Sequence, residues 1–324
     1  MKKNIAIIAG GDSSEIVVSL KSAEGIYSFI DKEKYNTYIV LLTQEKWEVQ
    51  LDNGKTVPID KNNFSFSFQE TSVRFDFAYI TIHGTPGENG LLQGYFELIG
   101  IPYSSCGVLA SALTFNKYIL NNYLRSFNID VAESVRLFRG QTLTPEELSK
   151  ICLPVFVKPN DGGSSFGASK VQTLSALQPA IDKAFKEGKE VIVEQYLQGC
   201  EITCGCYKTK DKEVVFPITE VVTDNEFFDF DAKYNGQVDE ITPARISAEL
   251  TEEIQRQTLK IYDLIGAKGL IRADYIITAD NKPVLLEVNT TPGMTVTSFI
   301  PQQVRAAGLD IKDVMIDIIE NEFN

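Results

Sequence analysis

The spacing of apolar residues changes repeatedly along the first hundred positions. Runs of consecutive apolar residues, typical of buried strands, are followed by stretches with the 3.6-residue spacing of amphipathic helices. The predicted strands are 5–9, 37–42 and 77–82, and the predicted helices are 15–30 and 90–99. Strands that alternate with helices build a parallel sheet covered by helices. We therefore expect an α/β domain over residues 1–104, with its second helix ending at Gly100.

The rest of the chain predicts two further units. We expect a central unit over residues 105–197 and a C-terminal unit of α+β character over residues 198–324. Their predicted elements are helices 117–127 and 175–187, strands 154–158, 168–171 and 191–196, and the antiparallel strands 201–208, 214–222, 270–278 and 283–289. The segment 223–243 is too rich in Asp, Asn and Gly for regular structure and too aromatic for a linker, so we expect a lid loop.

The strongest chemical signal lies in the last two strands, which an Ala-Asp-Asn-Lys segment of turn composition joins into a hairpin. Alternation places Glu287 and Asn289 on one face, and pairing can bring Asp274 and Arg272 beside them. Two carboxylates and an amide oxygen form an oxygen-only site, which Mg²⁺ accepts when nucleotide phosphates complete its shell. A single acidic residue on an edge hairpin is more often merely solvated, but the set favours a metal site.

A loop rich in Gly and Ser, residues 158–167, lies between two predicted strands. Its glycines let backbone N–H groups approach an anion, and the hydroxyl groups of Ser164 and Ser165 add donors. Taken alone, the loop is equally typical of a flexible hairpin. Beside a metal site in the same chain, a phosphate-binding role is favoured. Lys117 and Lys158 can then supply positive charge, although a single lysine is more often a surface residue.

The strand that contains Glu194 ends near Leu197 and enters a turn. Backbone groups at a strand end can bind the edge of an adenine, and a carboxylate slightly further on, such as that of Glu201, can bind ribose hydroxyls. These residues are candidates for nucleotide binding only together with the metal and phosphate motifs.

Composition narrows the class of protein. The 324 residues are 44% hydrophobic and 23% charged, which is typical of a globular protein with several compact units. A net charge of −13 argues against nucleic-acid binding, because neutralising phosphates requires clustered Lys and Arg. No apolar run is long enough to span a membrane, and the short N-terminal one is expected to be a strand and not a signal peptide. Five scattered cysteines and the single His83 form no zinc motif, and we expect a cytoplasmic protein.

Together, these motifs resemble the ATP-grasp enzymes and, within them, the D-alanine–D-alanine ligases. The matches extend nearly from end to end. They are residues 10–15, 18–20, 83–84, 87–90, 93–94, 100–103, 111–112, 117, 158–167, 233–234, 243–244 and 272–298. The resemblance implies an ATP-grasp fold, α/β with an α+β C-terminal part. It implies a three-domain ligase that has an N-terminal parallel sheet and holds the nucleotide between its central and C-terminal domains.

The resemblance also implies a role for each matched residue on the substrate side. Glu15 would anchor the ammonium group of the first D-alanine, linked by hydrogen bonds to Ser164 and to Tyr234 of the lid. His83 would lie close to the same substrate. Lys233 and Ser298 would bind the carboxylate of the second D-alanine. Arg272 and the backbone N–H of Gly293 would stabilise the oxyanion that forms when the second amine attacks.

For ATP, the resemblance implies that Lys117, Lys158, Ser164 and Ser165 hold the phosphates, and that Glu194, the backbone near Leu197, and Glu201 hold adenosine. Asp274, Glu287 and Asn289 would bind two Mg²⁺ ions, for which Mn²⁺ can substitute. ATP would convert one D-alanine into an acyl phosphate for attack by the second, in peptidoglycan precursor synthesis. The partners would be ATP, D-alanine and a second copy of the chain, with no nucleic acid and no membrane.

Four positions depart from the family pattern. Ile16 and Val17 stand where a basic and an acidic residue are common, Gln195 replaces a frequent lysine, and Asn116 replaces a frequent aspartate. None of these departures removes a predicted metal ligand or phosphate lysine. The alternatives to the main interpretation are a ligase that takes D-lactate or D-serine as second substrate, another ATP-grasp carboxylate–amine ligase, and a nucleotide-binding regulator without catalysis.

Overall fold

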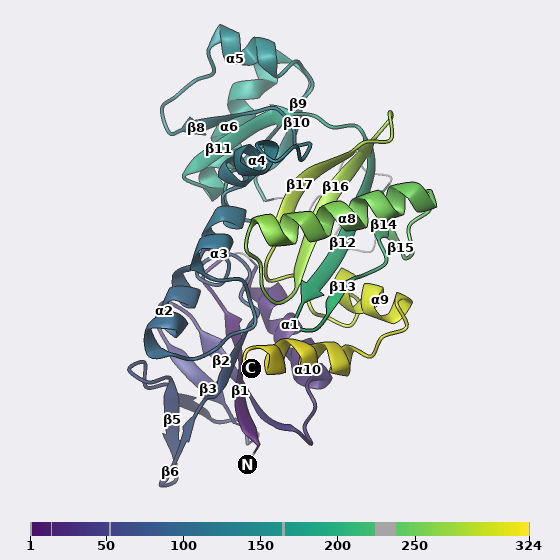
Figure 1. Ribbon diagram of the computed structural model, residues 1–324. Coiled ribbons are helices and arrows are strands. Elements are labelled where there is room, and N and C mark those ends of the chain that lie inside the picture. Colours follow the sequence, from purple (N-terminus) through teal and green to yellow (C-terminus); the bar gives the residue numbers. More distant parts are fainter. Residues whose placement is uncertain (1, 14, 52, 164–165, 224–237, 324) are drawn as a thin grey trace.

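The computed structural model describes residues 2–13, 15–51, 53–163, 166–223 and 238–323 (Figure 1). Its N-terminal part contains a sheet with the strand order β4-β3-β2-β1-β7. These strands are β1 (Lys3–Gly10), β2 (Tyr35–Leu42), β3 (Trp47–Gln50), β4 (Thr56–Pro58) and β7 (Phe77–Ile80). The predicted parallel arrangement is confirmed for β2, β1 and β7, and β3 and β4 extend the sheet antiparallel. Residues 43–46 are too few for a crossover helix, so β3 must return as a hairpin.

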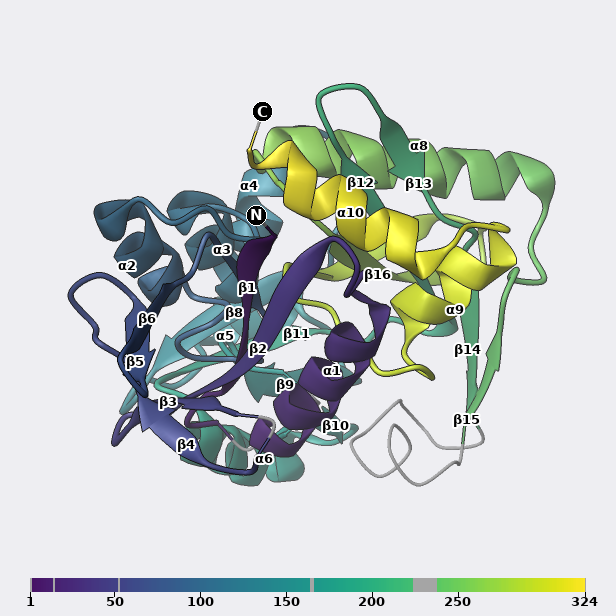
Figure 2. The same ribbon diagram turned by 90° about the horizontal axis from the view of Figure 1, so that it is seen from below.

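Alternate residues of β1 face two different cores. Ile5 and Ile7 pack with α1 (Ile16–Phe29) and with the C-terminal helices α9 (Phe299–Ala306) and α10 (Ile311–Asn321). Ala6 and Ile8 face the opposite side. Figure 2 shows α1 and α10 side by side over the first sheet, and the two helices are in contact. The C-terminal end of the chain therefore closes one face of the N-terminal sheet.

The second core of the N-terminal part is aromatic. It includes Phe64 and Phe96, whose rings lie 5.0 Å apart, and the hairpin of β5 (Ser65–Phe68) and β6 (Thr71–Arg74). Helix α2 (Leu91–Ile99) contributes Phe96 and ends at Gly100, whose φ of +68° lies in the left-handed region that favours glycine. The predicted end of this helix is confirmed.

The central sheet is antiparallel, with the order β10-β9-β11-β8. Its strands are β8 (Ser134–Phe138), β9 (Val155–Pro159), β10 (Ser169–Val171) and β11 (Glu190–Gln195). Helix α6 (Leu174–Glu187) packs on this sheet through Leu177, Ile181 and Ala184, and α5 (Pro145–Lys150) precedes β9. Because β9 and β11 are antiparallel neighbours, the loop that follows β9 begins beside the start of β11, where Pro159 pairs with Val191.

The C-terminal sheet has the order β15-β14-β12-β16-β17, with β13 paired to β12. The strands are β12 (Gly199–Lys208), β13 (Glu213–Val215), β14 (Thr219–Thr223), β15 (Val238–Ile241), β16 (Ile271–Thr278) and β17 (Pro283–Asn289). Helix α8 (Ala248–Leu264) packs against β12. The expected strand 214–222 is divided into β13 and β14, because Pro217 lacks the N–H that a continuous ladder needs.

The segment 223–243 differs from the sequence expectation. Residues 238–241 form strand β15, which pairs with β14, so the prediction that the whole segment lacks regular structure is wrong there. The pairing partner β14 ends at Thr223, where this segment begins, and the polar composition of the segment carries no signal for the pairing. Residues 224–237, with Lys233 and Tyr234, lie outside the described residues, and the lid role stays a prediction.

Helices α3 (Val108–Phe115) and α4 (Lys117–Arg125) connect the units. Their buried residues, among them Ala110, Leu120 and Leu124, pack in the core of the C-terminal sheet, although the sequence assigns them to the central unit. The proposed division of the chain at residues 104 and 197 stays a prediction. Among the described residues, no helix has the length and apolar character that crossing a membrane requires.

Candidate active site

The predicted pairing of the last hairpin is confirmed. Strands β16 and β17 align Arg272 with Asn289 and Asp274 with Glu287, so these four residues lie together on one face of the sheet. The turn between the strands contains Asn281 at a φ of +59°, a conformation that Asn tolerates better than most residues. Turn chemistry and strand alternation therefore place the predicted metal ligands and the predicted oxyanion arginine beside one another.

Asp274 is the centre of a dense hydrogen-bond network. The Arg272 guanidinium donates to both its oxygens, at 2.8 and 2.7 Å. Thr203 of β12 donates to Oδ1 at 2.6 Å, and Asn289 Nδ2 donates to Oδ2 at 3.0 Å. Burial would lower the pKa of Arg272, but Asp274 and then Glu287 raise it above its usual range. The arginine thus stays charged in a buried position where it can stabilise a developing negative charge.

The two predicted phosphate lysines flank this network, and both are largely buried. Lys117 Nζ, at the start of α4, donates to the Gly162 carbonyl at 2.6 Å and lies 3.4 Å from Glu287 Oε2. Lys158 Nζ, near the end of β9, lies 2.5 Å from Glu194 Oε1. Lys117 therefore connects the loop after β9 to Glu287 of β17. Lys158 connects the end of β9 to Glu194, one of the predicted adenosine residues.

A cavity of about 1680 Å³ unites these groups. Every predicted site residue that the structure describes lines it: Glu15, His83, Lys117, Lys158, Glu194, Leu197, Glu201, Arg272, Asp274, Glu287, Asn289, Gly293 and Ser298. The walls come from the loops after β1 and β7, from the central sheet and from the C-terminal sheet. Ser164, Ser165, Lys233 and Tyr234 lie outside the described residues.

Glu15 lies at the N-terminal end of α1, where helix N–H groups favour a negative charge. Its carboxylate lies near Gly163 of the phosphate loop, since a Cβ atom on that glycine would be 3.0 Å from Oε1 and 3.1 Å from Oε2. It also faces Gly84, where a Cβ would be 3.8 Å from Oε2. The N-terminal unit thus places an anionic group at the edge of the predicted phosphate loop.

His83 lies at the same end of the cavity and is buried. Its Nε2 is 3.4 Å from the Ser22 hydroxyl. Burial, helped by the positive charge of Arg272, lowers the pKa of His83 to about 4. The ring is therefore neutral at pH 7 and can act as a hydrogen-bonding group close to a substrate, without adding positive charge.

The turn after β17 places Gly293 beside Ser298. A Cβ atom at Gly293 would lie 3.1 Å from the Ser298 Oγ, and the same Oγ accepts the N–H of Thr295 at 3.0 Å. Next along the chain, the N–H of Met294 donates to Ser22 of α1 at 3.3 Å. The predicted oxyanion and carboxylate groups are therefore neighbours, held against the helix that starts at Glu15.

Glu88 was not assigned a role from the sequence, although it lies within a matched motif. It accepts the N–H of Gly84 and the hydroxyl of Thr291, both at 2.7 Å. Burial raises the pKa of Glu88 to about 7, and the charge of Glu15 contributes. Its position after a buried strand, between Gly87 and Gly90, is the signal from which it could have been found.

The donor set at the hairpin fits a hard divalent cation. Asp274 and Glu287 supply carboxylate oxygens and Asn289 an amide oxygen, which are ligands that Mg²⁺ accepts alongside phosphate oxygens and water. Within the described part of the chain, no group of three or more His, Cys, Asp or Glu residues could hold a metal by itself. A metal site here therefore needs the oxygen of Asn289 or ligands from a bound nucleotide.

Two antiparallel sheets that face a common cavity lined by both basic and acidic side chains define an ATP-grasp protein. Residues 4–106 match the family model described as D-ala D-ala ligase N-terminus, and residues 124–320 match the D-ala D-ala ligase C-terminus. The chain belongs to the D-alanine–D-alanine ligase family, and the resemblance predicted from its motifs is confirmed.

Known proteins resemble the chain over its whole length. It is 71% identical over 323 residues to a D-alanine–D-alanine ligase of Parabacteroides distasonis, covering 99% of this chain and 98% of the relative. The crystal structure of the VanG D-Ala:D-Ser ligase from Enterococcus faecalis superimposes with a TM-score of 0.88 at 31% identity, covering 99% of this chain and 100% of that one. A D-alanine–D-alanine ligase from Bacillus anthracis complexed with ATP has a TM-score of 0.78 at 30% identity, covering 99% and 97%.

Proposed function

We propose that this enzyme joins two D-alanine molecules into D-alanyl-D-alanine at the expense of ATP, for the synthesis of peptidoglycan precursors in the cytoplasm. The observation that supports the proposal is one cavity lined by two largely buried lysines, an oxygen ligand set, a carboxylate at Glu15 and the Arg272 guanidinium. The name and the 71% identity of the Parabacteroides distasonis relative support D-alanine as the substrate.

In the first step, a carboxylate oxygen of one D-alanine attacks the γ-phosphorus of ATP, the bond to ADP breaks, and an acyl phosphate forms. Charge neutralisation and positioning govern such a transfer. Lys117 and Lys158 hold the phosphates, with Ser164 and Ser165 of the same loop as further donors. Glu194, the backbone at Leu197, and Glu201 hold adenosine. All of these residues that the structure describes lie on the cavity wall.

Asp274, Glu287 and Asn289 would hold two Mg²⁺ ions, for which Mn²⁺ can substitute. When bound, these ions neutralise phosphate charge and polarise the transferred group. The protein's own contribution is to keep the two carboxylates facing each other across β16 and β17. Lys117, which is 3.4 Å from Glu287, then lies at the boundary between the metal ligands and the phosphate loop.

In the second step, the free amine of the other D-alanine attacks the carbonyl carbon, the carbon–oxygen bond to phosphate breaks, and the nitrogen loses one proton. The negative oxygen that develops is stabilised by Arg272 and the N–H of Gly293. Glu15, linked to Ser164 and Tyr234, anchors the ammonium group of the first D-alanine, and the neutral His83 lies beside it. Lys233 and Ser298 bind the carboxylate of the second.

We also propose that two copies associate through α2 and α3. Leu91 and Leu98, seven residues apart on α2, and Leu109 on α3 are 63%, 89% and 79% exposed. Val108, the first residue of α3, lies close to α2, because a Cβ at Gly94 would be 3.8 Å from its Cγ2. Figure 1 shows α2 at the left edge of the N-terminal part and α3 between α2 and α4. Helix α3 has no charged residue, so two copies of a chain with net charge −13 can approach there without strong repulsion.

One alternative is supported by a specific observation. The VanG enzyme that resembles the chain at 31% identity is a D-Ala:D-Ser ligase, so D-serine is the rival second substrate. A coupled assay of ADP release, with products identified by mass spectrometry, distinguishes these possibilities. The substrates are D-alanine alone, D-alanine plus D-serine, D-alanine plus D-lactate, and L-alanine. We expect D-alanyl-D-alanine as the main product. A mixed product as the main species would replace the proposal, and no ADP release with any substrate would favour a regulator.

A further inference from the structure

Asn160 follows β9 directly, two residues after Lys158, and it is completely buried. It does not line the active-site cavity, whereas its neighbours Pro159 and Asp161 do. A buried amide in this position must be hydrogen-bonded to avoid a large desolvation cost. The question is therefore which parts of the molecule use its donors and acceptors.

All four of its polar groups have partners, and these come from two segments. On one side, its N–H donates to the Glu190 carbonyl at 3.0 Å, and its Nδ2 donates to Glu190 Oε2 at 2.7 Å. On the other side, its Oδ1 accepts the N–H of Tyr118 at 2.9 Å, and its carbonyl accepts the N–H of Lys117 at 3.2 Å. Asn160 thus connects the start of β11 to the start of α4.

These bonds satisfy donors that every helix leaves unpaired in its first turn. Asn116 caps α4 in the usual way by accepting the N–H of Ile119 at 3.0 Å. The two preceding N–H groups, those of Lys117 and Tyr118, are bonded by Asn160. The first turn of α4, which carries Lys117, is therefore fixed from outside by the strand that carries Lys158.

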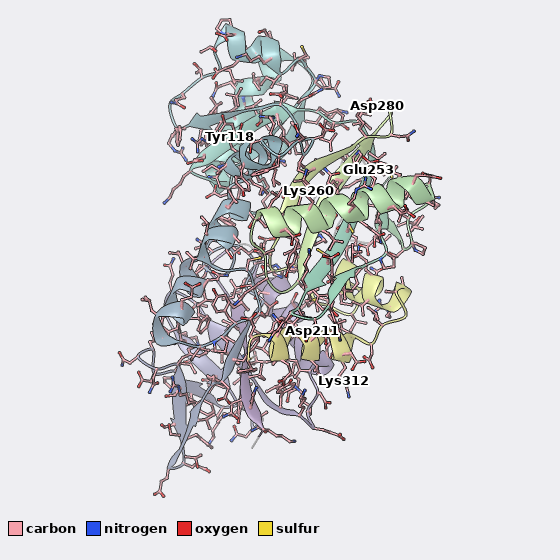
Figure 3. The ribbon with its side chains drawn as sticks, viewed as in Figure 1. Tyr118, Asp211, Glu253, Lys260, Asp280 and Lys312 are labelled. Atoms are coloured by element: carbon pink, nitrogen blue, oxygen red, sulfur yellow. The ribbon has the colours of Figure 1, made fainter. Side chains whose placement is uncertain are left out.

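Glu190 determines the orientation of the Asn160 amide. An ionised carboxylate only accepts hydrogen bonds, so the amide nitrogen must face Glu190 and the amide oxygen must face Tyr118. Glu190 is itself held by Arg136, whose Nη1 lies 3.5 Å from Oε2 and whose guanidinium lies 4.9 Å from the centre of the Tyr118 ring. Figure 3 labels Tyr118 on α4, next to the central sheet. Arg136, Glu190, Asn160 and Tyr118 thus form a closed arrangement behind the site.

We propose that Asn160 is a positioning residue that sets the place of Lys117 relative to Lys158, and so the affinity of the enzyme for the phosphates of ATP. Lys117 reaches the Gly162 carbonyl and Glu287 only if the first turn of α4 stays fixed. The inference rests on the proposed phosphate role of Lys117. It assigns to Asn160 an effect on ATP and none on the binding of D-alanine, which contacts other parts of the cavity.

The test is a pair of substitutions that reverses one hydrogen bond. Asn160→Asp keeps the acceptor for Tyr118 but places two carboxylates against each other. This should displace the first turn of α4 and raise the KM for ATP about tenfold or more, a free-energy change of the size that one helix cap contributes. Combining it with Glu190→Gln supplies an amide donor to the introduced carboxylate and should bring the KM for ATP back to within about threefold of wild type. The KM for D-alanine should stay unchanged in both. Asn160→Ser is a second, uncharged variant whose short hydroxyl cannot span Tyr118 and Glu190.

Two controls separate the possible outcomes. Ser247→Ala removes the cap of α8, where Ser247 accepts the N–H of Leu250 at 3.2 Å, and it should lower the melting temperature without changing the KM for ATP. Lys117→Ala tests the proposed function itself, because a normal KM for ATP in that variant would remove Lys117 from the site. The positioning role is overturned if Lys117→Ala weakens ATP binding while Asn160→Asp and Asn160→Ser do not. It is also overturned if the two Asn160 variants weaken D-alanine binding as much as ATP binding. In both cases the proposed function of the enzyme still stands.

Discussion

The hydroxyl of Thr291 donates a hydrogen bond of 2.7 Å to Glu88 Oε1, joining two residues that are 203 positions apart in the sequence. The other oxygen of Glu88 accepts the N–H of Gly84. This carboxyl group therefore ties the loop that carries His83 to the turn that ends in Gly293. Both segments line the cavity, so the bond fixes the end that contains His83 by joining the first and last parts of the chain.

The protonation of Glu88 should make folding stability depend on pH. Burial raises the pKa of Glu88 from 4.5 to about 7 in the folded protein, so between these values the folded state binds more protons than the unfolded state. The free energy of unfolding contributed by this group must then fall as the pH rises from about 4.5 to about 7, and stay constant outside that window. In Glu88→Gln the contribution is absent.

Urea unfolding of wild type and Glu88→Gln at several pH values between 4.5 and 8 measures this contribution. The difference in unfolding free energy, wild type minus variant, should decrease as the pH rises. The exposed Glu45→Gln is the matched control, for which the difference should not change. A difference for Glu88→Gln that is equally constant would mean that the carboxyl group is ionised throughout this range.

His83 should remain largely neutral from pH 8 down to pH 5.5. Burial and Arg272 lower its pKa to about 4, and the chain contains no other histidine, so its ring signals need no assignment. In an NMR titration from pH 8 to pH 5.5, the carbon-bound ring protons should move by less than about a tenth of the full protonation shift. A midpoint between pH 6 and 7 would show that the ring is solvated and charged, and would remove it from the buried end of the cavity.

The charge of Glu287 should be essential for activity and dispensable for folding. Glu287→Gln keeps the size of the side chain but removes a carboxylate that faces Asp274 across the hairpin. If Glu287 is a metal ligand, as proposed, its loss should lower the rate of ADP release by about a hundredfold or more, since a bound metal supplies several kcal/mol of charge stabilisation. Asp280→Asn, in the turn of the same hairpin and labelled in Figure 3, is the matched control. Wild-type turnover of Glu287→Gln at ordinary Mg²⁺ concentration would refute the metal assignment.

Much of the site could be predicted because its chemistry lies in local patterns. Asp274 and Glu287 face each other through strand alternation and a four-residue turn, both of which can be recognised in the sequence. Lys158 and its glycine-rich loop form one continuous motif. The helix end at Gly100 and the parallel strands β2, β1 and β7 follow from local signals in the same way.

The features that could not be predicted depend on contacts that form only in the folded chain. Strand β15 exists because β14 pairs with it, and nothing in its own four residues distinguishes it from the polar segment before it. Asn160 appears in the sequence as one more polar residue of a loop, and its importance comes from two N–H groups of α4 that meet it only in the folded chain. Glu88 is similar, because its partner Thr291 lies at the other end of the sequence.

The proposed contact between two copies should depend on the apolar residues that α2 and α3 expose. In a symmetric dimer both copies contribute the same surface to the interface. A single substitution, Leu98→Glu or Leu109→Glu, would therefore bury two new carboxylates in each dimer. We expect either substitution to weaken association on the order of a hundredfold or more, because unpaired buried charges are strongly unfavourable. Leu309→Glu is the matched control, since Leu309 is 41% exposed between α9 and α10, away from α2 and α3. Sedimentation velocity should give twice the chain mass for wild type and Leu309→Glu and the chain mass for the other two variants. A wild-type dimer that survives both substitutions would place the interface elsewhere on the surface.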